Sequence, residues 1–239
     1  MVFDLAWLVG AVVLMFGSWV QTTLGFGLAV VAAPFLVWIS PSWVPVVLTI
    51  TALLLSIINT WNQRLDLHVS SMITPMITRI PGTVVGVWLL SIMSSDHLQI
   101  FVSATVMLAV VVSLMKSKFE ASALNLGIAG AVSGFTGSTT AIGGPPMAVV
   151  LQHGKPASVR ANLSLYFTYS CIISLLGYYW AGMLSHEIIV LSLSFIPFML
   201  FGFFIGKGHR KHISAERFRK SLLLVCFIAA VAALAGVLA

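Results

Sequence analysis

The chain consists of long apolar runs separated by short polar connections, and no water-soluble fold can be built from such a pattern. Apolar residues make up 59% of the 239 residues and charged residues only 8%, whereas an ordinary globular protein carries about 25% charged residues. So few charges cannot cover a surface that faces water, and the outside of the fold must therefore face lipid. The sequence predicts an all-α polytopic membrane protein.

The formal net charge of +6 does not indicate a nucleic-acid partner. The Lys and Arg residues lie in short connections between apolar runs, as they do in the cytoplasmic loops of membrane proteins. Cys171 and Cys226 both lie within apolar runs, so neither a disulfide framework nor a cysteine metal site is expected. We expect no metal and no cofactor. Residues 1–16 have no basic residue and include Asp4, which argues against a cleaved signal peptide.

The lengths of the apolar runs set the number of membrane spans. A span needs about 20 apolar residues, and six runs have this length: 42–60, 72–93, 98–115, 161–181, 188–206 and 220–238. Two further runs, 3–39 and 122–152, are longer. As one straight helix the first would reach about 55 Å, nearly twice a hydrocarbon core of about 30 Å. Each long run must therefore bend or break.

Each long run contains one segment that is unsuited to a continuous helix. Residues 21–27 and 133–146 are rich in glycine, threonine and serine, and the second ends in two prolines. Such residues favour unwound backbone, because glycine is costly within a helix, proline lacks an N–H and hydroxyls compete for backbone partners. We expect a helical hairpin in each run, with the second arms starting at Leu28 and Pro145.

The two breaks align with each other. Gly25 and Gly137 are 112 positions apart, and so are the prolines that follow them. The chain is therefore expected to form two homologous halves, 1–120 and 121–239, each with one hairpin followed by three spans. Interrupted apolar segments at matching positions of two halves are typical of transporter binding sites.

The distribution of basic residues predicts the topology. Lys and Arg occur in the connections on both sides of 122–152, so both connections are expected in the cytoplasm. This run would then be a re-entrant hairpin, and 3–39 would be its inverted copy, entering from outside. The alternative is eight crossings with parallel repeats, because residues 3–20 would reach about 27 Å as a helix and could nearly cross alone.

The tips of the hairpins have the groups that bind an anion. The start of a helix presents free N–H groups and a positive dipole end, glycines permit close approach, and hydroxyls add donors. An oxyanion would thus be held without a buried cation. The polar face of span 161–181 adds two side chains. The candidate substrate-binding residues are Thr22, Thr23, Gly25, Gly27, Thr136, Gly137, Ser138, Thr139, Thr140, Gly143, Gly144, Asn162 and Tyr166.

Each of these features also has a purely structural interpretation. The glycines could serve close helix packing, either within the bundle, which we favour, or between two subunits of a homodimer. Three motifs have the spacing for this role: Gly82-x-x-x-Gly86, Gly130-x-x-x-Gly134 and Gly202-x-x-x-Gly206. Arg79, near the start of a span, is interpreted as reaching out to the membrane interface. His153, Lys155 and Arg160 could attract anions to the inner mouth, but we favour an ordinary positive-inside loop as their explanation.

All six carboxylates are predicted in loops or at span ends: Asp4, Asp66, Asp96, Glu120, Glu187 and Glu216. Proton antiport through a core Asp/Glu relay is therefore disfavoured. A coupling cation, Na⁺ or H⁺, would have to bind main-chain carbonyls and hydroxyls of unwound backbone. The same lack of core carboxylates argues against an intramembrane aspartyl protease, and no His-Glu-x-x-His motif is present for a metalloprotease. We do not expect an enzyme.

Two duplicated segments carry a family resemblance. The glycine-rich segments at 25–34 and 134–146, and the Ile-Pro-x-x-x-x-Gly motif that starts at Ile80 and again at Ile196, resemble the TauE/SafE family of sulfite exporters and related anion permeases. The first segment departs from the family pattern, since Leu28 to Val30 stand where a third glycine often occurs. The resemblance covers essentially the whole chain. It implies movement of sulfur-containing anions, such as sulfite, sulfoacetate or other organosulfonates, across the bacterial cytoplasmic membrane.

Taken with the resemblance, these patterns predict a secondary transporter of small sulfur oxyanions. The anion would lie between the paired half-helix N-termini near the membrane midplane, and its partners would be the lipid bilayer and a coupling cation. The alternative is a passive anion channel, or a permease for another small oxyanion or a carboxylate.

Overall fold

The computed structural model describes residues 4–114, 119–209, 224 and 226–235, and in these residues it is helical, with no strand. The longer helices end at or near the short connections of the sequence. They are α1 (Leu5–Leu24), α2 (Leu28–Ile39), α3 (Val46–Asn62), α4 (Ile73–Ile92), α5 (Ser95–Leu114), α6 (Ala123–Thr140), α7 (Gly144–Leu151), α8 (Pro156–Trp180), α9 (His186–Ser194) and α10 (Ile196–His209). Single 3-10 turns, η1 (Pro41–Trp43), η2 (Arg64–Asp66) and η3 (Val69–Met72), join some of them.

Six helical segments among the described residues are long and apolar enough to cross a membrane. Five of them match predicted spans: Pro41–Asn62, Val69–Ile92, Ser95–Ser113, Pro156–Trp180 and His186–His209. The sixth is Leu5–Leu24, the first arm of the run 3–39. Its 20 residues fit the alternative in which this arm crosses the membrane alone. The predicted span 220–238 lies partly outside the described residues, which contain its apolar helix Cys226–Ala235.

Each long run breaks inside its predicted segment, but the breaks are shorter than expected: residues 21–24 and 133–140 are helical, and only 25–27 and 141–143 are not. α1 ends at Gly25, whose φ of 95° belongs to the left-handed region that glycine readily adopts, and α2 begins after Gly27, with φ 123°. α6 ends at Ala141, a non-glycine residue with φ 63°, and α7 begins at Gly144 with a proline at its first turn. A proline is tolerated there because the N–H that it lacks would have no helical partner.

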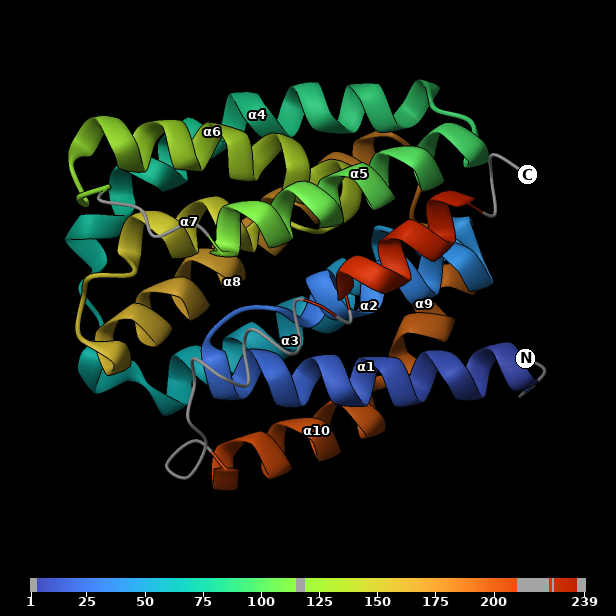
Figure 1. Cartoon of the computed structure of the whole chain (residues 1–239), viewed down its shortest axis with the longest axis horizontal. Helices are drawn as coiled ribbons and strands as arrows, with labels where there is room; N and C mark the ends of the chain where they lie inside the picture. The colour runs from blue at the N-terminus through green and yellow to red at the C-terminus, as the bar shows by residue number, and fades with distance from the viewer. Residues whose placement is uncertain (1–3, 115–118, 210–223, 225, 236–239) are drawn as a thin grey trace.

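The helices run roughly along one common direction (Figure 1). α1 starts at the right-hand end of that view, and α2 runs back toward the same end. α7, in contrast, runs back toward the left-hand end, where α6 starts. The connection from α3 to α4 and that from α7 to α8 also lie at the left. Each broken segment therefore leaves the bundle at the end where it entered it.

Glycines let two pairs of helices pack closely. A Cβ atom at Gly82 or Gly86 of α4 would collide with the backbone of α6, and one at Gly202 or Gly206 of α10 would collide with that of α1. The same pairs, α4 with α6 and α1 with α10, lie side by side in Figure 1. The expected packing of these motifs within one bundle is confirmed.

Apolar side chains cover the outside of the molecule, and many polar side chains lie inside it. Large apolar side chains such as Trp61, Trp88 and Phe204 are exposed on the outer faces, whereas many hydroxyls and one arginine, Arg79, are buried. The helix α2 lies within the largest apolar cluster, and its Leu36 is fully buried. Such a pattern suits a bundle that is surrounded by lipid and keeps its polar groups inside.

Candidate functional site

A small cavity of about 50 Å³ lies where the two breaks meet. From the first break, Gln21 and Gly27 line it, followed by the first turn of α2. From the second broken run, Gly137 of α6 lines it, together with Gly143 and Gly144 at the start of α7. Residues of α3, α4 and α8 complete the wall. The cavity therefore has the elements of both halves of the chain around it.

The first turn of α2 is open to this cavity. The first N–H groups of a helix have no partner within the helix, and Ala29 and Val30 of that turn line the cavity. Gln21 fixes the start of the helix, because its Oε1 accepts the N–H of Leu28 at 3.3 Å and its Nε2 donates to Ser56 Oγ at 3.2 Å. The positive end of α2 therefore points at the cavity.

Arg79 of α4 also lines the cavity, and its side chain is only 2% exposed. Its Nη1 donates to the carbonyl oxygen of Ser133 at 2.8 Å and to Ser133 Oγ at 3.0 Å, and its Nη2 donates to Ser174 Oγ at 3.2 Å. The guanidinium carbon lies 5.7 Å from the centroid of the Tyr166 ring. The sequence-based interpretation of Arg79 as an interfacial residue is wrong, and so is the expectation that the site contains no buried cation.

The close contact between α4 and α6 explains why Arg79 points inward. α4 lies so near α6 that a Cβ at Gly134 would collide with the carbonyl oxygen of Arg79. One turn further along α6, a Cβ at Gly137 would lie 2.9 Å from Arg79 Nη2. The guanidinium therefore occupies space that only glycine leaves free.

No described carboxylate neutralises Arg79. Its hydrogen-bond partners, Ser133 and Ser174, are neutral, and its Nε has no partner. The described carboxylates are all exposed: Asp4, Asp66, Asp96, Glu120 and Glu187. A buried charge without a counter-charge is costly. The hydroxyl of Ser170, which lines the same cavity, is likewise buried without a partner. The cavity thus offers unused donors and a positive charge to an anion.

Four of the residues expected at the site line this cavity: Gly27, Gly137, Gly143 and Gly144. The expected hydroxyls of the break segments are engaged within their own helices. Each donates to the carbonyl oxygen four residues earlier, as serine and threonine commonly do in helices; they are Thr23, Thr136, Ser138, Thr139 and Thr140.

The remaining expected residues do not line this cavity, and Asn162 lines a second, wider pocket instead. Thr22 Oγ1 accepts from Asn59 Nδ2 at 3.4 Å. Gly25 lies against Arg160, whose Cγ would be 2.8 Å from a Cβ at that position. Asn162 and Tyr166 form hydrogen bonds with backbone groups. Asn162 Oδ1 accepts the N–H of His68 at 2.9 Å, and the Tyr166 hydroxyl donates to the carbonyl oxygen of Gly130 at 3.5 Å.

Sequence reasoning missed Arg79, Gln21 and Ser174 as cavity residues. A signal was present for the first, because an ionisable residue inside an apolar span faces the bundle interior more often than lipid. Gln21 belongs to the predicted break 21–27, but only the threonines and glycines of that segment were named as candidates. For Ser174, the sequence offered only a polar residue on a helix. Among the described residues there is no group of three or more His, Cys, Asp or Glu side chains that could hold a metal ion.

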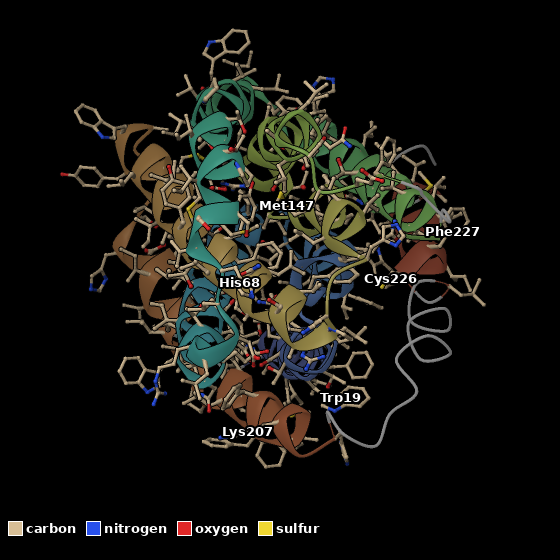
Figure 2. All side chains as sticks on the ribbon, turned by 90° about the vertical axis from the view of Figure 1, so that its left-hand side faces the viewer. Trp19, His68, Met147, Lys207, Cys226 and Phe227 are labelled. Carbon is tan, nitrogen blue, oxygen red and sulfur yellow. The ribbon has the colours of Figure 1, made fainter. Side chains whose placement is uncertain are left out.

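A second, wider pocket of about 730 Å³ lies at the end of the molecule that Figure 2 views. His68, labelled there, lines it together with His153 and Lys155 of the connection between α7 and α8. An apolar cluster that includes Met72, Met147 and Leu163 packs beside the break segments, next to this pocket. The central cavity and the wider pocket have no lining residue in common.

Six apolar helices among the described residues, long enough to cross a membrane, are typical of a multi-pass membrane protein, and the polar cavity among them suits a transporter. The family described as sulfite exporter TauE/SafE matches residues 9–233, and the chain belongs to this family. Its members are transporters and not enzymes. No curated protein and no solved structure matches the chain.

Proposed function

We propose that this protein is a secondary transporter of small sulfur-containing anions, such as sulfite or small organosulfonates, in the bacterial cytoplasmic membrane. The family supports the anion class. The observation that carries the proposal is the cavity at the two breaks, where Arg79 is buried with neutral partners. An anion that enters would supply the missing counter-charge, and the first turn of α2 would add N–H donors.

The proposed topology consists of two inverted halves, 1–120 and 121–239, each with one re-entrant hairpin. Three features support it. Each hairpin returns to the end at which it entered, and the two hairpins enter from opposite ends (Figure 1). α7 has eight residues, about 12 Å of helix, too little to cross a bilayer. Finally, the glycines of α4 pack on α6 as those of α10 pack on α1.

A transporter is favoured over the alternative of a passive channel by the apolar cluster around α7. A channel needs a continuous polar path, whereas Phe26 and Phe167 both lie close to Gly144, which lines the cavity. Both belong to the apolar cluster beside the wider pocket, so access from that pocket to the cavity would require these aromatic side chains to move. Such a closed side fits alternating access.

Flux measured in proteoliposomes tests this proposal. Sulfite, sulfoacetate, sulfate and acetate are offered separately, with Na⁺ and pH gradients varied one at a time. We expect sulfite flux that saturates and that at least one gradient accelerates. A flux that rises linearly with concentration and ignores both gradients would favour the channel. The absence of flux for every anion would refute the assignment.

A further inference from the structure

The Arg79 guanidinium has N–H donors that no protein group accepts. A guanidinium has five N–H groups in one plane. Nη1 donates to Ser133 and Nη2 donates once, to Ser174, whereas Nε has no partner. The Nε–H and the second N–H of Nη2 therefore remain. Two N–H groups of one guanidinium can donate to two oxygens of the same oxyanion. Such charge-assisted hydrogen bonds are stronger than hydrogen bonds between neutral groups.

The hydroxyl of Ser170 offers a further donor in the same cavity. It is buried without a hydrogen-bond partner. A buried hydroxyl destabilises the fold unless a ligand or a water molecule forms a hydrogen bond with it. Ser170 lies on α8, one turn before Ser174, which bonds to Arg79. A hydroxyl at this position can therefore donate to an oxygen of an anion that the guanidinium holds.

The size of the cavity limits the ligand. Its volume of about 50 Å³ is roughly a third of the ~150 Å³ cavity that accommodates benzene in an engineered protein core. A Cβ at Gly137 would lie 2.9 Å from Arg79 Nη2 and 3.2 Å from Gly143 Cα, so the walls are already close together. A sulfur atom with its three oxygens is near the largest group that fits, and a sulfonate with a carboxymethyl arm is too long.

We infer that Arg79 is the anion-binding residue of this cavity, that Ser170 donates a further hydrogen bond, and that the pair selects compact oxyanions over elongated organosulfonates. The inference rests on the proposed function and specifies its ligand contacts. The guanidinium supplies both charge and shape. A lysine at the same position would keep the charge but lose the planar set of N–H donors.

Two variants with matched controls test the assignment in the full-length protein, purified in detergent, with sulfite binding measured by calorimetry. Arg79→Lys is compared with Arg64→Lys, because Arg64 is exposed and bonds to the carbonyl oxygen of Trp61. Ser170→Ala is compared with Ser103→Ala, because the Ser103 hydroxyl is also buried without a partner but lies outside the cavity. The second pair remains informative if Arg79→Lys fails to fold.

We expect sulfite to bind at least about tenfold more weakly to Arg79→Lys and to Ser170→Ala, the effect of losing one charge-assisted hydrogen bond, and unchanged to both controls. Sulfoacetate should bind the unmodified protein at least about tenfold more weakly than sulfite. If folded Arg79→Lys and Ser170→Ala bind sulfite as the unmodified protein does, the inference is wrong while the proposed function stands. Equal affinity for sulfoacetate would refute the size limit. If the unmodified protein binds none of these anions, the proposed function itself fails.

Discussion

Gly137 and Arg79 depend on each other, since the guanidinium lies where a larger residue on α6 would stand. Gly137→Ala should displace the guanidinium and weaken sulfite binding at least about tenfold. Gly127→Ala is the control on the same helix, because its Cβ would have only ordinary contacts, at 3.6 Å or more, with Thr78 and Thr74. Calorimetry on both folded variants measures the difference. Equal affinity in the two would show that the position of Arg79 does not matter for binding.

Gln21 provides a second test of the cavity charge. Gln21→Glu keeps the shape of the side chain but introduces a carboxylate into the cavity that Arg79 lines. The new carboxylate would neutralise the guanidinium and compete with the anion, so we expect sulfite affinity to fall by about tenfold or more. Gln63→Glu, a buried position away from the cavity, is the control. Unchanged flux and affinity in Gln21→Glu would place the anion elsewhere.

For single residues, the sequence predicted the glycines that line the cavity better than it predicted the polar side chains that line it. Gly27, Gly137, Gly143 and Gly144 could be predicted because a break in an apolar run is visible in composition alone. Whether a hydroxyl points at a ligand or at its own helix depends on the rotamer, which no spacing determines. From the sequence alone, the threonines Thr139 and Thr140 could not be distinguished from threonines that line a cavity, although their hydroxyls bond within their own helix.

At the scale of helices, the two glycine contacts make a stability prediction. A Cβ at Gly82 or Gly202 would collide with a backbone carbonyl oxygen, that of Ala131 or Met15. A backbone atom cannot turn aside as a side chain can, so each change to alanine should cost about 1–3 kcal/mol. The melting temperature in detergent should fall for both. Gly208→Ala, with open space around its Cβ, should leave it unchanged. Equal melting temperatures would show that α4 and α10 are free to shift.

Five spans and both breaks could be predicted because length and hydropathy determine them directly. Whether α1 crosses the membrane could not be predicted, because its 20 residues are long enough to cross and could equally form one arm of a hairpin. Helix partners were also beyond the sequence. A pair of glycines four residues apart marks a face that packs closely, and α4, α6 and α10 each carry one, but the spacing does not show that the first two pack on each other. The partner of α10, α1, carries no such pair.

For the whole molecule, labelling from the two sides of a membrane tests the proposed topology. Glu120→Cys and Lys155→Cys, which flank the α6–α7 hairpin at exposed positions, should both react with an impermeant reagent only from the cytoplasm. Ser42→Cys, exposed between α2 and α3, should react only from outside. Both native cysteines, Cys171 and Cys226, are buried and are replaced by alanine beforehand. Reaction of the first two from opposite sides would restore eight crossings.

The neutral surroundings of Arg79 have a consequence for energetics across the membrane. In an alternating-access cycle, the site that contains Arg79 is exposed first to one side of the membrane and then to the other. When empty it would carry one positive charge, and with a monovalent anion bound it would carry none. A membrane potential of about 100 mV acts on one charge with about 2.3 kcal/mol. An inside-negative potential would therefore draw the empty site inward and leave the loaded site unaffected. The cycle would be electrogenic, and the cell's own voltage would drive the anion outward.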